Sequence, residues 1–134
     1  MSAEAEVLVA NQAFYDAFSA GDVAAMDALW ARQAAVVCLH PGWEILRGRD
    51  TVMASWKAIL ESPGHPRVQP VGAQAFVYGA AALVACYERL QGGLLAATNV
   101  FVHEDGRWRL VSHQAGPAPA PSAPEPADQG TRLH

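Results

Sequence analysis

The chain is poor in lysine, in cysteine and in long apolar runs. Lys57 is the only lysine among 134 residues, and the formal net charge is −4. Without a cluster of Lys and Arg, counterion release cannot drive binding to nucleic acid, which argues against such a partner. No apolar run approaches the ~20 residues that a membrane helix needs, and the acidic residues 1–6 lack the basic start of a signal peptide. We therefore expect a cytoplasmic protein with no membrane partner.

The two cysteines do not point to a metal or a redox site. Cys38 and Cys86 each fall within an apolar segment, and their spacing does not match a CxxC pair. Both are interpreted as buried, reduced thiols. No spacing of carboxylates or histidines supports a metal site, so we expect neither a metal nor a cofactor.

The residues that are present predict one α+β domain. Hydrophobic residues make up 51% of the chain and charged residues 16%, a surplus suited to a cavity lining or a subunit interface. The apolar spacing predicts helices at 4–20, from Asp22 to Trp30, and at 48–60. A short strand is expected at 35–39 with a return arm at 44–47, and longer strands near 68–78, 81–90, 94–103 and 107–115. The domain should cover 1–116, with a Pro/Ala-rich disordered tail at 117–134.

Several motifs in this order resemble those of the SnoaL-like, or nuclear transport factor 2-like, superfamily. They are the segments 18–22, 47–52, 79–90, 98–101 and 106–114. The superfamily includes ketosteroid isomerases, polyketide cyclases and the association domain of calcium/calmodulin-dependent kinase type II. The resemblance implies a cone-shaped fold of cystatin-like topology, with three N-terminal helices packed on a curved, mainly antiparallel sheet around a pocket. It also implies a homodimer formed through the sheet.

The segment from Cys38 to Trp43 is the most informative part of the chain. His40 ends an apolar run and precedes the Pro41–Gly42 turn, a placement that aims a side chain into a cavity. The resemblance puts His40 where ketosteroid isomerases carry a general-base Asp. A histidine has an unperturbed pKa of about 6.5, which suits proton transfer near neutrality. His40 could act as a base, hydrogen-bond a bound polar group, or only cap the turn.

The other isomerase groups are incomplete by resemblance. Phe14 falls at the place of their oxyanion-donor tyrosine, and Tyr15 is expected to point a sixth of a turn or more away. Asn99 falls near their second oxyanion donor and can donate a hydrogen bond without a raised pKa. Steroid isomerase activity proper is therefore not expected, whereas a related proton transfer or ring closure stays open.

Phe14 and Tyr15 are predicted to contact a ligand, and five further residues are predicted to bind it. Trp43 should lie at the pocket rim, while Trp56 could stack on a ligand or belong to the core. By resemblance to the association domain, Arg89, Ser112 and Gln114 should face the pocket. Alternation along the last strand puts Ser112 and Gln114 on one face with Trp108 and Leu110, and puts Arg109, Val111 and His113 on the other. Solvated charges with no role are expected at Glu88, His103, Glu104 and Asp105, and His113 is expected far from His40.

The sequence thus predicts a small-molecule-binding protein with a mostly apolar pocket and an unassigned ligand. An isomerase, cyclase or lyase acting on a small apolar or carbonyl-containing molecule is one hypothesis, with His40 transferring a proton and Asn99 polarising the oxygen. A non-catalytic binding domain is the second. An association or oligomerisation domain is the third, and it is disfavoured because such a domain normally accompanies a catalytic one.

Overall fold

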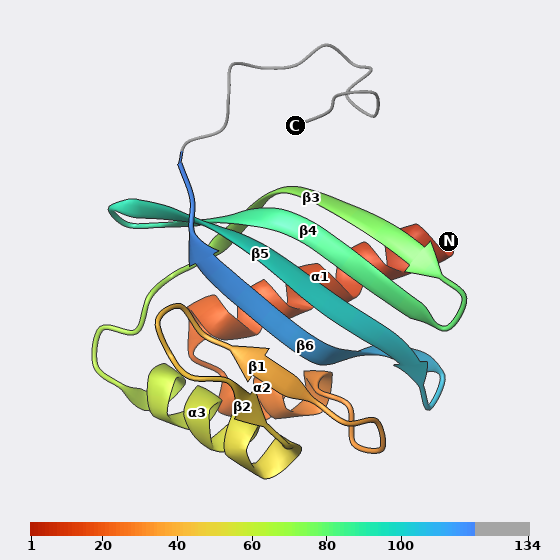
Figure 1. The fold of residues 1–134 in the computed structure, drawn as a ribbon, viewed down its shortest axis with the longest axis horizontal. Helices are drawn as coiled ribbons and strands as arrows, with labels where there is room; N and C mark the ends of the chain where they lie inside the picture. Colours follow the sequence, from red (N-terminus) through yellow and green to blue (C-terminus); the bar gives the residue numbers. More distant parts are fainter. Residues whose placement is uncertain (120–134) are drawn as a thin grey trace.

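A computed structural model describes residues 1–119, and residues 120–134 lie outside the described part. Within it, three helices pack on one six-stranded sheet with the strand order β2-β1-β6-β5-β4-β3 (Figure 1). The helices are α1 (Ala3–Ala20), α2 (Val23–Leu29) and α3 (Arg49–Glu61). The strands are β1 (Val37–Leu39), β2 (Leu46–Arg47), β3 (Gln69–Tyr78), β4 (Ala81–Leu90), β5 (Gly93–Glu104) and β6 (Arg107–Pro117). The predicted elements and their order are confirmed.

The end of the domain differs slightly from the prediction. Pro117 is the last residue of β6 and pairs with Leu95, and the Ala118 N–H donates to the Leu94 carbonyl at 3.2 Å. The sheet pairing therefore continues to residue 118, two residues past the predicted domain boundary at 116. Residues 120–134 of that tail lie outside the described residues.

Helix α1 supplies one wall of the interior. Ser2 caps it by accepting a hydrogen bond from the Ala5 N–H at 3.1 Å. The helix ends at Gly21, whose φ of 67° is left-handed. A Cβ at Gly21 would also lie 2.9 Å from the His65 ring and 3.2 Å from the Leu60 carbonyl, so glycine is required for two reasons. In Figure 1, α1 crosses one face of β3 to β6, while α3 lies beside β1 and β2.

The sheet is mainly antiparallel, with one parallel pair. Strands β3 to β6 form an antiparallel meander, and β1 pairs in parallel with β6. In this register Cys38 lies opposite His113, so the end of β1 is carried to the middle of β6. His40 and His113 are therefore neighbours, with ring centroids 6.3 Å apart, and the expected separation of these two strands is wrong.

A bulge in β6 reverses the predicted assignment of its faces. Val100 pairs with Ser112 and Phe101 with Leu110, so Val111 is the extra residue. Leu110 is buried before the bulge, and His113 and Ala115 are buried after it. Simple alternation across 108–114 therefore fails, because one inserted residue exchanges the two faces.

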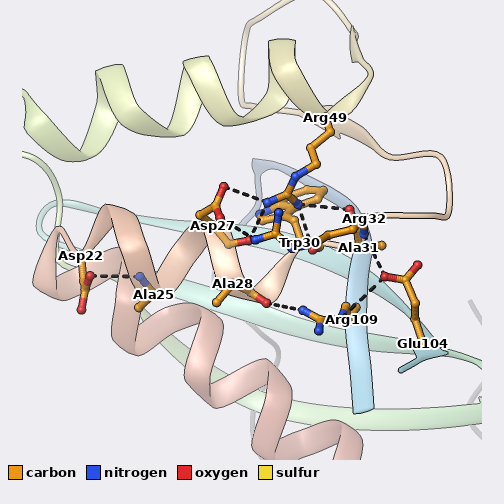
Figure 2. A network of polar contacts seen from close by, with 10 residues as sticks. All are labelled: Asp22, Ala25, Asp27, Ala28, Trp30, Ala31, Arg32, Arg49, Glu104 and Arg109. Atoms are coloured by element: carbon orange, nitrogen blue, oxygen red, sulfur yellow. Dashed lines mark hydrogen bonds and ion pairs between the residues drawn. The ribbon is translucent and has the colours of Figure 1, made fainter. Parts of the chain in front are cut away.

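A polar network joins the loop after α2 to α3 and to the β5–β6 hairpin (Figure 2). The Arg49 guanidinium donates to the carbonyls of Asp27, Trp30 and Ala31 and to the Asp27 carboxylate, at 2.8–3.1 Å. The Glu104 carboxylate accepts from three consecutive backbone N–H groups, those of residues 32–34, at 2.8–3.1 Å. These hydrogen bonds lower the pKa of Glu104, with the Arg32 N–H the largest cause. Glu104 is thus a structural anchor and not the solvated charge that was expected.

Candidate functional site

The interior of the cone contains a cluster of polar side chains where a purely structural core would be apolar. Asn99 and His113 lie opposite each other on β5 and β6, and the register continues from His113 to Cys38 on β1. Tyr15 comes from α1 and Glu88 from β4. Each of Tyr15, Glu88, Asn99 and His113 is at most 1% exposed. Buried polar groups are costly unless they are paired, so their partners decide what the cluster can do.

Asn99 is the centre of the hydrogen-bond network. Its Nδ2 donates to Asn11 Oδ1 at 2.9 Å and to the Tyr15 hydroxyl at 3.0 Å, which uses both amide hydrogens. The Tyr15 hydroxyl in turn donates to Glu88 Oε2 at 2.6 Å. The phenol therefore lies inside the polar cluster, and the prediction that Tyr15 points away from it is wrong.

The orientation of Asn99 determines the tautomer of His113. Since both Asn99 amide hydrogens are donated elsewhere, its Oδ1 must accept the 2.6 Å hydrogen bond from His113 Nδ1–H. Burial, together with a smaller effect of the nearby His40, lowers the pKa of His113 to about 3. At neutral pH the imidazole is therefore uncharged, with its lone pair on Nε2.

Glu88 and His113 form a close pair in a dry environment. Oε2 of Glu88 lies 3.9 Å from Nε2 of His113. That distance alone fits an ion pair, whereas burial raises the pKa of Glu88 and lowers that of His113. A charged pair at this distance would gain about 4 kcal/mol at an effective dielectric constant of 20. Desolvating two ions costs several kcal/mol each, so burial favours the neutral form of both groups, in which Glu88 carries a proton.

His40 lies beside this pair at the end of β1. Its Nε2 is 2.9 Å from Ser55 Oγ, and Ser55 donates its own hydrogen to the Val52 carbonyl at 2.6 Å. The Ser55 hydroxyl must therefore accept from His40 Nε2–H, which leaves the lone pair on Nδ1. Burial lowers the pKa of His40 to about 4, so this imidazole is also neutral near pH 7.

Aromatic rings enclose the histidines. The Trp56 ring lies 4.8 Å from that of His40 and 5.7 Å from that of His113. Phe14 contacts both Trp56 and His113 from the other side. The Trp56 Nε1–H is buried without a hydrogen-bond partner among the described residues. Trp43 covers His40 at 4.7 Å and is 49% exposed, so it lies between the cluster and the solvent.

The structure gathers six of the nine predicted site residues. His40, Asn99, Phe14, Tyr15 and Trp56 are in the buried cluster, and Trp43 is at its edge as expected. Asn99, however, has no amide hydrogen left for a ligand oxygen. It holds Tyr15 and His113 in place instead.

The other three predicted residues do not face this cluster. Gln114 and Arg89 are exposed, and Ser112 precedes the inward-facing His113. The β6 bulge moves Ser112 and Gln114 to the outer face of the sheet, and Arg89 follows the inward-facing Glu88 in strict alternation. These three residues therefore lie outside the buried cluster, and Gln114 lines a hollow on the outer face instead.

Sequence reasoning missed Glu88 and His113. A signal for Glu88 exists, because it lies in phase with the buried residues Ala82, Val84 and Cys86 along β4. Its position near a hairpin end predicts a solvated charge instead, and the structure contradicts that prediction. For His113 the chain offers no such signal, since its direction depends on the bulge.

The described surface also has a hollow on the outer face of the sheet. Its volume is about 620 Å³, and the polar side chains that line it are Gln74, Tyr87, Thr98 and Gln114. Small residues such as Ala85, Ala96 and Gly116 form its floor. This hollow lies on the opposite side of the strands from the buried cluster.

Two further observations limit the chemistry. Residues 1–119 contain no group of three or more His, Cys, Asp or Glu side chains that could hold a metal ion. No helix in the described part of the chain is long and apolar enough to cross a membrane.

Comparisons with known proteins identify related chains. The model of the SnoaL-like domain matches residues 7–121. A solved structure from Streptomyces avermitilis, a candidate dehydratase of the NTF2-like family, is 35% identical with a TM-score of 0.79. The match covers 87% of this chain and 96% of that one. A candidate calcium/calmodulin-dependent protein kinase type II association domain from Thiobacillus denitrificans is 32% identical with a TM-score of 0.75, over 84% of this chain and 94% of that one.

Among curated proteins, the F-box protein SKIP8 of Arabidopsis thaliana is 27% identical over 111 residues. The match covers 81% of this chain but only 48% of that protein, so the chain spans about half of its length.

Proposed function

Because the chain belongs to the SnoaL-like domain family, we propose that it binds a small, neutral, mostly apolar molecule inside the cone and that His40 exchanges a proton with it. A carbonyl group is the part of the ligand that this chemistry needs, since it acidifies the neighbouring C–H bond. The proposal includes a cytoplasmic location and an isomerase, cyclase or lyase reaction. The dehydratase name of the Streptomyces relative falls in the last of these classes.

The buried polar cluster is the observation that supports this proposal. Four ionisable side chains, those of Tyr15, His40, Glu88 and His113, lie within one enclosed region. Burial raises the pKa of Tyr15 and Glu88 and lowers that of His40 and His113. A core that serves stability alone would place apolar groups there, because polar networks are favourable only when fully paired. Clusters of this kind are typical of functional sites.

The geometry supports distinct tasks for two groups. His40 is a neutral base whose lone pair is on Nδ1, because Ser55 holds the opposite nitrogen. The Trp56 Nε1–H is a buried donor without a partner in the described chain, and a ligand oxygen would satisfy it. Trp43 is half-exposed, and its displacement would open a path from the solvent to His40.

The charge of the interior favours a neutral ligand. The inward-facing histidines are uncharged near pH 7, and Arg89 and Lys57 are exposed on the outside. An anionic ligand would find no cation inside, and desolvating it would be costly. We therefore expect carboxylates to bind more weakly than neutral carbonyl compounds of the same shape.

The test combines ligand screening with proton exchange. We expect neutral aromatic and alicyclic ketones to raise the thermal midpoint of the native protein and to exchange their α-hydrogens with D2O. In His40→Asn the exchange rate should fall at least about 100-fold, the usual scale for a positioned base, while thermal stabilisation by the ketone persists. Lys57→Ala, which alters an exposed residue of α3, is the control. Equal exchange by native protein and His40→Asn would rule out His40 as the base.

An association role is the second candidate, because the Thiobacillus relative carries that name. The outer face of the sheet exposes Tyr78 and Phe76, at 68% and 40%. We propose a homodimer in which two such faces meet, with the hollow beside Tyr87 inside the interface. Light scattering at micromolar concentration should then give twice the chain mass, and Leu83→Glu on the outer face should give a monomer. A native monomer would rule out this interface.

A further inference from the structure

Glu88 Oε2 and His113 Nε2 face each other but are too far apart to form a direct hydrogen bond. The two atoms are 3.9 Å apart, beyond the 2.7–3.2 Å of a direct hydrogen bond. Around them the network is complete: Glu88 accepts from Tyr15, and His113 donates its Nδ1–H to Asn99. In the neutral form Glu88 supplies one donor and His113 Nε2 one acceptor, directed at the same region.

The 3.9 Å separation of the two atoms matches the span of one bridging oxygen. An oxygen about 2.8 Å from both atoms subtends an angle of about 90°, which is acceptable for a hydrogen-bonded hydroxyl. A hydroxyl can accept from the Glu88 acid and donate to His113 Nε2 at the same time. A carbonyl oxygen can only accept, and an ammonium can only donate, so each would leave one of the two buried groups without a partner.

The surrounding side chains hold the pair rigidly. Tyr15 is fixed between Asn99 and Glu88, and Asn99 is fixed by Asn11, so neither Glu88 nor His113 can turn without breaking a buried hydrogen bond. The His113 ring also packs against Phe14 and Trp56. A site that is held before binding loses little entropy when its ligand arrives.

We propose that Glu88 and His113 together bind one hydroxyl group of the ligand, with the Glu88 acid donating to its oxygen and His113 Nε2 accepting its hydrogen. This inference rests on the proposed function, because the hydroxyl belongs to the molecule whose carbonyl-bearing part reacts at His40. The His40 and His113 rings are 6.3 Å apart, so one small molecule can contact both. The ligand class is thereby narrowed to neutral, hydroxylated molecules.

The test uses the native protein with ¹⁵N-labelled histidine and three probes of one shape: benzyl alcohol, benzaldehyde and toluene. Benzyl alcohol should bind at least about tenfold more tightly than toluene, because it forms two hydrogen bonds in a site built for them. It should move the Nε2 resonance of His113, whereas benzaldehyde and toluene should leave that resonance in place. His65, which lies outside the cluster, is the internal control.

Two variants of matched length separate the roles. Glu88→Gln keeps a neutral donor beside His113, but its NH2 group cannot accept from Tyr15, whose hydroxyl is left with Cys86 Sγ at 3.4 Å. The preference for benzyl alcohol should therefore fall but persist. Glu88→Met removes the donor, and the preference should disappear. Glu61→Gln, at the exposed end of α3, should match the native protein. If Glu88→Met does not fold, the ¹⁵N titration of the native protein and the affinities of Glu88→Gln still test the hydroxyl site.

Each outcome has a definite meaning. Equal affinities for the three probes, or an unmoved His113 resonance on binding of benzyl alcohol, would overturn the hydroxyl site while leaving the proposed function intact. The same holds if the pair holds only a water molecule, since benzyl alcohol would then gain nothing over toluene. Failure of all three probes to bind at millimolar concentration would overturn both proposals.

Discussion

At the scale of single residues, the direction of each hydrogen bond follows from counting donors. Asn99 has two amide hydrogens and uses both, so its oxygen must accept from His113. Ser55 has one hydroxyl hydrogen and gives it to Val52, so it must accept from His40. The two imidazoles consequently have opposite tautomers. The lone pair of His40 is therefore on Nδ1, 3.9 Å from Cys38 Sγ, and that of His113 is on Nε2.

Tyr15 tests this network at the residue scale. Replacing Tyr15 by Phe removes the donor to Glu88 and an acceptor of Asn99, so two buried groups lose a partner. We expect the free energy of unfolding to fall by about 2–4 kcal/mol, measured by urea denaturation. Tyr78→Phe is the matched control, because Tyr78 is 68% exposed, and it should change stability by less than about 0.5 kcal/mol. Equal effects of the two substitutions would refute the network.

At the scale of elements, the parallel pairing of β1 with β6 builds the site. It places Cys38 opposite His113 and lets His40 continue past the strand end into the interior. Helix α3 then contributes Ser55 and Trp56 to the same region, since it follows β2 directly. The start of α3 is held by Arg49, which bonds the carbonyls that α2 leaves free at its end (Figure 2).

The hydrogen bonds of Arg49 between α3 and the end of α2 should contribute measurably to stability. Arg49→Ala should lower the free energy of unfolding by about 2–3 kcal/mol, because several charge-assisted hydrogen bonds to the end of α2 are lost. Lysine at this position should recover only part of the loss, since it lacks the planar fork. Arg47→Ala, two residues earlier and exposed, is the control and should be nearly neutral. Guanidinium denaturation of the three variants distinguishes these outcomes, and an Arg49→Ala as stable as Arg47→Ala would contradict the anchoring role.

At the scale of the whole molecule, buried neutral histidines make stability depend on pH. The pKa values of His40 and His113 are about 4 and about 3 in the fold, against 6.5 when free. Between these pKa values the two histidines are protonated in the unfolded chain but not in the folded chain. The free energy of unfolding is therefore highest above pH 6.5 and falls as the pH is lowered toward 4. Glu88 acts in the opposite sense, since its pKa is raised and the fold retains its proton.

The resulting slope is a measurable quantity. The two histidines together make the free energy of unfolding change by about 2.7 kcal/mol per pH unit. If Glu88 contributes one whole proton in the opposite sense, this slope falls to about 1.4 kcal/mol per pH unit. We expect the free energy of unfolding near pH 5, from urea titrations at several pH values, to fall with acid at a slope between these limits. His40→Asn should reduce the slope by about 1.4 kcal/mol per pH unit. A flat profile between pH 6.5 and 4.5 would show that the two histidines titrate normally in the fold.

Much of the fold could be predicted from the chain, but only part of the site. The helix periods and the turns at Gly79, at Gly92 and at Gly106 predicted all nine elements within the described residues. The rim position of Trp43 and the inward direction of His40 also followed from local signals. The bulge at Val111, which exchanges the faces of β6, has no comparable signal, because it arises from pairing with β5.

The order of elements, the family and the place of His40 can be inferred from the sequence, since these depend on local periodicity, turn residues and short motifs. The burial of Glu88, the approach of His113 to His40 and the outward direction of Arg89, Ser112 and Gln114 become known only from the three-dimensional fold. Which way a strand residue points depends on its register with neighbours distant in sequence, and the charge of a side chain depends on the solvent that those neighbours exclude.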